Sequence, residues 1–81
     1  MIAREESLAL LAALPPADRA NDRLIPFARV EQIVGLRRSR IYKMIRSGDF
    51  PAPYKPGGYS SRWSEAEVRA WVDGVKRAAA A

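Results

Sequence analysis

The sequence predicts a mainly α-helical domain with a small β-hairpin, arranged as a winged helix-turn-helix. Two short helical patterns are separated by a tight turn that contains a glycine. A segment rich in proline and glycine follows them, and a strongly patterned third helix closes the domain. The chain has 81 residues, which is enough for one domain with a thin core.

The N-terminal segment predicts an amphipathic helix over residues 4–14, which Pro15 and Pro16 end. A polar linker follows this helix. The predicted division is therefore an N-terminal helix and linker over 1–22, a winged helix-turn-helix domain over 23–77, and a tail that frays over 78–81. Because an isolated helix of this length is marginal in water, we expect it to cover its own domain or to support self-association.

The first helix of the domain follows Pro26, a residue suited to a helix start. Its apolar face consists of Phe27, Val30, Ile33 and Val34. Gly35 comes next, at a position that favours a left-handed cap. The pattern predicts a helix of about two turns.

The second helix lies within residues 36–48, with Gly48 as its stop. Ile41, Met44 and Ile45 share its apolar face. Five cations lie between positions 37 and 46 with no acid among them: Arg37, Arg38, Arg40, Lys43 and Arg46. The chain has a net charge of +5 and a pI of about 10.2, so its excess charge is concentrated in this segment.

A helical wheel places a polar face opposite the apolar one. It carries Ser39, Lys43 and Arg46, with Tyr42 between the faces and Arg40 on the other flank. Arginine donates two hydrogen bonds to guanine O6 and N7, and lysine donates to the same atoms or to a phosphate. The serine hydroxyl donates to a phosphate oxygen. This face therefore predicts insertion into the major groove of DNA.

A basic helix of this kind has other interpretations. A solvated helix face normally interleaves both signs of charge, which this segment does not. Calmodulin-binding and membrane-surface helices are also basic and amphipathic, but they are usually longer and have no neighbouring helix and wing. A basic module that binds an acidic protein stays open as an alternative of another class.

The proline and glycine segment predicts the wing. Extended pieces at 54–55 and 61–63 flank a tip at 56–60 that contains two glycines. The expected DNA contacts of this wing are Lys55, Tyr59, Ser60, Ser61 and Arg62. A plain hairpin that covers the core is the alternative, with Arg62 paired to a carboxylate.

The third helix begins with a predicted capping box, in which Ser64 accepts from the Glu67 amide and the Glu67 side chain reaches back. Its apolar face consists of Val68, Trp71, Val72 and Val75. We assign Phe50, Trp63 and Trp71 to the core, because large aromatic rings supply buried area where core is scarce. Tyr42 has two open roles, in the core or at a phosphate.

The chain contains no Cys and no His. The usual nucleophile–base pairs and zinc ligands are therefore missing, and we expect neither an enzyme nor a cofactor or metal. No apolar run approaches the roughly 20 residues that cross a bilayer. Residues 1–6 are acidic where a signal peptide would be basic, so we expect a cytoplasmic protein.

These residues resemble those of the AlpA-type phage regulators, which are similar to excisionases and to the DNA-binding domains of MerR-like regulators. The resemblance rests on RLIP at 23–26, Val30, VGLRRSRIY at 34–42, GDFPAP at 48–53 and WSEAEVRAW at 63–71. It implies a winged helix-turn-helix with its recognition helix at 38–47 and its wing at 54–62. Arg37 and Arg40 depart from the family, which usually has small polar residues there.

The resemblance also implies two related functions. One is an excisionase-like recombination directionality factor, which binds and bends double-stranded DNA cooperatively so that an integrase assembles an excisive complex. The other is a transcriptional regulator of a mobile genetic element, which uses the same surface. The sequence does not separate them.

Overall fold

The computed structural model describes residues 21–80. The predicted N-terminal helix at 4–14 and most of its linker lie outside these residues. The described elements are β1 (Leu24–Ile25), α3 (Phe27–Val34), α4 (Arg38–Ser47), the 3-10 turn η1 (Pro56–Gly58), β2 (Trp63–Ser64) and α5 (Glu65–Ala80). This part of the chain is mainly helical with a small antiparallel β element, which confirms the predicted fold class.

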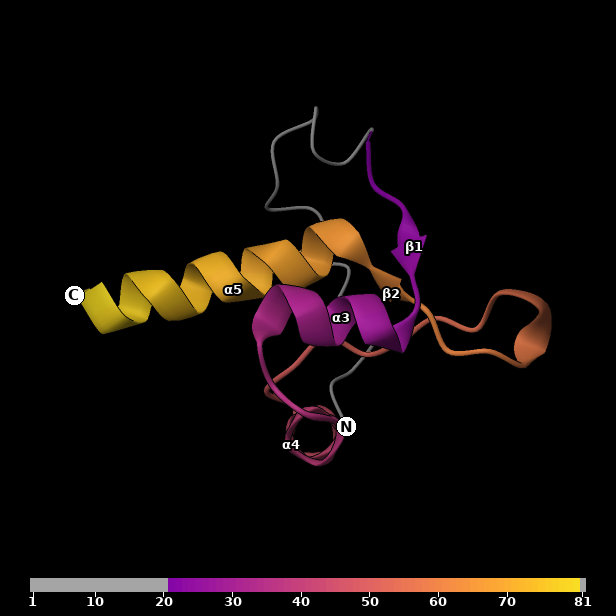
Figure 1. Cartoon of the computed structure of the whole chain (residues 1–81), viewed down its shortest axis with the longest axis horizontal. Helices are drawn as coiled ribbons and strands as arrows, with labels where there is room; N and C mark the ends of the chain where they lie inside the picture. Colours follow the sequence, from indigo (N-terminus) through magenta and orange to yellow (C-terminus); the bar gives the residue numbers. More distant parts are fainter. Residues whose placement is uncertain (1–20, 81) are drawn as a thin grey trace.

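The two helices of the helix-turn-helix have the predicted ends. Gly35 caps α3 with φ of 74° and donates its amide to the Glu31 carbonyl, and Gly48 caps α4 with φ of 85°. A positive φ costs glycine nothing, so the chain turns sharply at both places. Figure 1 shows α4 end-on below α3, while α5 runs lengthwise across the view.

The strand pairing differs from the expected hairpin. β2, which contains Trp63, pairs with β1 in an antiparallel register that aligns Leu24 with Ser64. The strand β1 was not predicted from the sequence. Two residues are too few for a periodic pattern, and their partner lies far along the chain.

The wing is a loop closed at its base. Tyr54 and Arg62 exchange backbone hydrogen bonds of 2.6 and 2.7 Å and form an isolated bridge. The tip is the turn η1, in which Gly57 and Gly58 have φ of 75° and 87°. Because Pro56 has no amide to donate and both glycines turn the chain, the ladder does not extend toward the tip.

The core lies where the helices meet the small sheet. Its buried apolar side chains are Ile25, Val30, Ile41, Ile45, Phe50, Trp63 and Val68. Full burial of Phe50 and Trp63 confirms their predicted place. Trp71 is half-buried, packs edge-on against Phe50 and donates its indole N–H to the Asp49 carbonyl at 2.7 Å.

The start of α5 is held by more groups than the predicted capping box. Ser64 Oγ accepts from the Glu67 amide at 3.1 Å, as expected. The buried Glu67 carboxylate does not reach back but accepts from the Tyr54 hydroxyl at 2.7 Å, which ties the wing to α5. Asp22 accepts from the Ala66 amide at 2.9 Å.

The other end of α5 extends to Ala80, where we expected residues 78–81 to fray. Alanine has the highest intrinsic helix propensity, which favours this extension. None of the helices within residues 21–80 combines the length and the apolar character that crossing a membrane requires.

Candidate nucleic-acid interface

α4 has one face in the core and the opposite face in solvent. Ile41 and Ile45 are buried, and Met44 packs against the core while remaining partly accessible. On the other side, Ser39, Lys43 and Arg46 are exposed. The predicted division of the helix into a packed and a solvent face is therefore confirmed.

The solvent side of α4 carries positive charge without nearby compensation. Arg37, Arg38, Arg40 and Lys43 are all exposed. Within residues 21–80, no carboxylate lies within 4.0 Å of these four side chains. Like charges placed so densely repel each other, and a polyanion relieves that repulsion.

Ion pairs gather on a different element. Glu65, in the first turn of α5, lies 3.0 Å from Arg23 Nε, 3.7 Å from Arg29 Nε and 3.4 Å from an Arg69 terminal nitrogen. The hydrogen bond from Arg23 is the main cause that lowers the pKa of Glu65, and the charges of Arg23 and Arg69 add to it against the opposing effect of burial. Their charge is thus engaged in holding the fold.

The N-terminus of α4 has no side-chain cap. Its N-cap residue is Arg37, and the first intrahelical bond runs from the Ile41 amide to the Arg37 carbonyl at 3.1 Å. The amides of residues 38–40 precede that bond, so they lack helical partners. Together with the exposed Ser39 hydroxyl, they are suited to donate hydrogen bonds to a phosphate oxygen.

Tyr42 packs against neighbouring aromatic rings. Its ring stacks on Phe27 with centroids 5.4 Å apart and meets Trp63 edge-on at 6.3 Å. Arg38 lies over the same group, with its Cζ 4.4 Å from the Phe27 centroid. The place of Phe27 at this surface was not predicted from the sequence, because its partners belong to different elements and only packing brings them together.

The predicted wing residues differ in exposure. Lys55, Tyr59 and Ser60 are exposed, and Tyr59 retains 90% of its accessible surface. Ser61 and Arg62 are half-buried, and Arg62 donates to the Ser61 carbonyl at 2.9 Å. Among the described residues, Arg62 has no ion pair with a carboxylate, so the expected alternative pairing is absent there.

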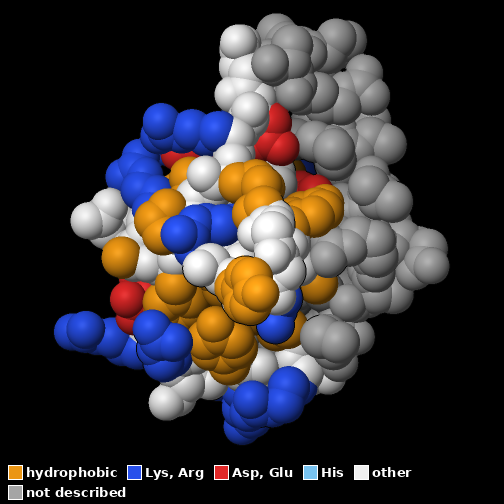
Figure 2. Space-filling view, turned by 90° about the vertical axis from the view of Figure 1, so that its right-hand side faces the viewer, with side chains coloured by type: hydrophobic (Ala, Val, Ile, Leu, Met, Phe, Trp, Pro, Cys, Tyr) orange, Lys and Arg blue, Asp and Glu red, His pale blue; other side chains and the backbone are white. Residues whose placement is uncertain are grey.

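The end of the molecule that carries the wing faces the viewer in Figure 2. Lys and Arg side chains occur on several sides of a central group of apolar side chains, and few acidic ones are visible. Basic side chains extend to the bottom of this view, the level at which α4 lies in Figure 1. The wing and the basic helix thus belong to a largely cationic part of the surface.

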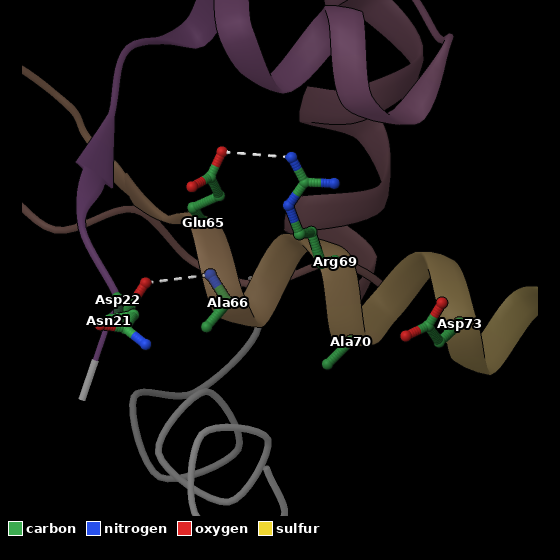
Figure 3. Close-up of a pocket in the computed structure, with 7 residues that line it drawn as sticks. All are labelled: Asn21, Asp22, Glu65, Ala66, Arg69, Ala70 and Asp73. Carbon is green, nitrogen blue, oxygen red and sulfur yellow. Dashed lines mark hydrogen bonds and ion pairs between the residues drawn. The ribbon is translucent and has the colours of Figure 1, made fainter. Parts of the chain in front are cut away.

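A hollow of about 260 Å³ lies beside the start of α5. Its lining comprises Asn21, Asp22, Glu65, Ala66, Arg69, Ala70 and Asp73 (Figure 3). The polar groups at its centre already have structural partners: Asp22 bonds the Ala66 amide, and Glu65 bonds Arg69. Residues 21–80 contain no cluster of three side chains suited to hold a metal ion.

Comparison with known proteins gives two matches. The sequence profile of the family described as "Prophage CP4-57 regulatory protein (AlpA)" matches residues 23–77. "Uncharacterized protein ORF88" of Enterobacteria phage P4 is 38% identical over 61 residues, which cover 75% of this chain and 69% of that protein. No solved structure is significantly similar.

Proposed function

Because this chain belongs to the AlpA family of phage regulatory proteins, we propose that it is a sequence-specific DNA-binding protein of a mobile genetic element. The observation that carries this proposal is the cationic face of α4. Four exposed cations on and beside this helix have no carboxylate within 4.0 Å among the described residues, while Ile41 and Ile45 anchor the opposite side.

In this proposal α4 enters the major groove and the wing lies against the neighbouring backbone and minor groove. Arg38, Lys43 and Arg46 contact base edges or phosphates, and Ser39 binds a phosphate. Arg37 and Arg40 add phosphate contacts, which set register and affinity. Tyr42 contributes its ring to the support of the helix, with its hydroxyl directed to the backbone of the DNA.

The wing contributes Lys55, Tyr59 and Ser60 from its exposed tip, with Ser61 and Arg62 nearer its base. Its two glycines let the backbone approach a nucleic-acid strand closely. A basic side chain at such a tip is attracted by the negative potential of a narrow minor groove. Helix and wing together would then read two adjacent grooves.

Within this class we favour an excisionase-like recombination directionality factor, with an integrase as partner. The elements that resemble excisionases are the same helix pair and wing that form the cationic surface. A transcriptional regulator is the second candidate, and the description of the matched family as a regulatory protein favours it. An excision assay beside a reporter assay separates the two. Either function would act on DNA in the cytoplasm.

The test replaces Lys43 and Arg46 together by alanine and measures binding to duplex DNA by gel shift. We expect affinity to fall about 100-fold or more, because two groove contacts are lost. The matched control replaces Lys76 and Arg77, two exposed cations on α5, which changes net charge equally. Circular dichroism checks that both variants fold, and an unchanged gel shift in K43A/R46A overturns the assignment of α4.

Salt dependence separates this proposal from a module that binds an acidic protein. Neutralising about five to seven phosphates predicts that log affinity falls against log salt with a slope of roughly −0.9 per contact. K43A/R46A should reduce that slope, while the α5 control should not. A shallow, sequence-independent slope with tight binding to an acidic protein would favour the other class.

A further inference from the structure

Arg38 is held over an aromatic group that reaches from the surface into the core. Its Cζ lies 4.4 Å from the centroid of Phe27 and 5.8 Å from that of Tyr42. The two rings stack on each other with an interplanar angle of 15°. Trp63, which is fully buried, meets both rings edge-on at 5.5 and 6.3 Å. The platform beneath Arg38 is therefore fixed by the core.

The platform constrains the arginine but leaves its donors available. A cation over a ring is held by the ring quadrupole, and this contact uses no N–H group. Arg38 is exposed, and no hydrogen bond or ion pair joins it to another of the residues 21–80. Arg23 and Arg29, by contrast, are paired with Glu65. Part of the rotamer entropy that a long side chain loses on binding is thus already lost in the free protein.

We propose that Arg38 recognises one guanine of the target through O6 and N7, and that Phe27 is the positioning residue that holds the guanidinium for this contact. The inference rests on the proposed function and names the specificity-determining residue of that surface. Arg38 is the first residue of α4, and the N-terminal residues of a recognition helix are the ones that reach base edges.

A guanine fits this side chain better than a phosphate does. O6 and N7 are two acceptors in one plane, which match the planar fork of a guanidinium whose orientation the rings already restrain. A phosphate accepts from many directions and gains less from such orientation. Among residues 21–80, no comparable aromatic contact is made by the neighbouring Arg37, Arg40 and Lys43, which are suited to phosphates.

The experiment uses the full chain and begins with selection of bound duplexes from a randomised pool. Each guanine of the selected site is then replaced in turn by 7-deazaguanine, which lacks the N7 acceptor. We expect one replacement to weaken binding of the unmodified protein about 5- to 100-fold. R38A should lose affinity for the unmodified site and become insensitive to that same replacement.

Phe27 is tested with a pair of variants. F27L removes the π face and keeps an apolar side chain, so we expect lower sensitivity to 7-deazaguanine with similar affinity for random DNA. F27Y retains the ring and should restore the sensitivity. A side chain with a purely structural role would change the unfolding midpoint and leave the discrimination between the two duplexes unchanged, which would overturn the positioning role.

Two further outcomes distinguish failure of this inference from failure of the proposed function. If R38A weakens binding to every duplex by one factor and keeps its sensitivity to 7-deazaguanine, Arg38 contacts phosphate and this inference fails while the proposed function stands. If the unmodified protein selects no duplex at all, the proposed function fails. Because Arg38 is exposed, R38A should fold normally. The test of Arg38 therefore stands even if F27L does not fold.

Discussion

Asp22 holds the start of α5 and joins it to the segment before β1. Its Oδ1 accepts from the Ala66 amide at 2.9 Å and from the Arg23 amide at 2.8 Å, and its Oδ2 accepts from the Ser64 hydroxyl at 2.5 Å. Asp22 is the last residue of the N-terminal helix and linker that the sequence predicts over 1–22. Its contacts make it part of the folded domain, because a helix start needs acceptors for its orphan amides.

We expect D22A to lower the free energy of unfolding by about 1–2 kcal/mol, through loss of the cap and of the buried serine's partner. Urea denaturation measures the change. D73A is the matched control, since Asp73 is exposed on the same helix and should change stability by less than about 0.5 kcal/mol. Equal losses in the two variants would contradict a capping role.

Glu65 makes stability depend on acid pH. The hydrogen bond from Arg23 is the main cause that lowers the pKa of Glu65 below 4.5, the ordinary value, and Arg69 adds to it. Folding therefore favours the ionised carboxylate. The resulting stabilisation is complete above the unfolded-state pKa and is lost as the pH falls through the folded-state pKa.

The variant E65Q should accordingly be less stable than the unmodified protein near neutral pH, and the difference should shrink as the pH falls below about 4. Thermal unfolding across this range measures it. E31Q, on α3 and outside the arginine cluster, is the control. A difference that stays constant with pH would show that ionisation of Glu65 contributes nothing to folding.

Replacement of glycine by alanine should have opposite effects on stability in α4 and α5. Gly48 caps α4 at φ of 85°, a conformation that costs alanine about 1–2 kcal/mol, although open space surrounds the position. Gly74 lies inside α5, also with nothing within 4 Å of an added Cβ. There alanine should stabilise the helix by about 0.5–1 kcal/mol.

We therefore expect G48A to lower the unfolding midpoint and G74A to raise it, as measured by urea denaturation. G48A should also weaken DNA binding, because the last turn of α4 carries Arg46. G74A should leave DNA binding unchanged. Changes of the same sign in the two variants would mean that backbone conformation does not decide their effect.

In the proposed function the whole domain presents a basic helix and a wing to DNA, so the proposed bending belongs to the molecule rather than to one element. On tandem copies of the selected site we expect cooperative ladders in gel shifts and bent DNA in a circular-permutation assay. A bend that costs about 1–6 kcal/mol becomes affordable when several bound copies share it. A single, non-cooperative complex on straight DNA would contradict the directionality-factor version.

The sequence by itself determined the helix pair and the face that each helix buries. Apolar spacing and the glycines at 35 and 48 are local signals, so both ends of α3 and the last turn of α4 were predicted from them, while the start of α4 at Arg38 was implied by the family resemblance. The cluster of cations over 37–46 was equally predictable, because the charge of each residue follows from the sequence without knowledge of the fold. The candidate surface on α4 follows from these two facts.

The tertiary structure decided the contacts that join distant segments. Asp22 and Ser64, 42 positions apart, meet only because β1 lies against β2, and the Arg38 platform needs α3, α4 and β2 together. For the same reason the Glu67 carboxylate accepts from the Tyr54 hydroxyl instead of its predicted local partner. Such pairings depend on the path of the whole chain, and no local pattern of residues encodes them.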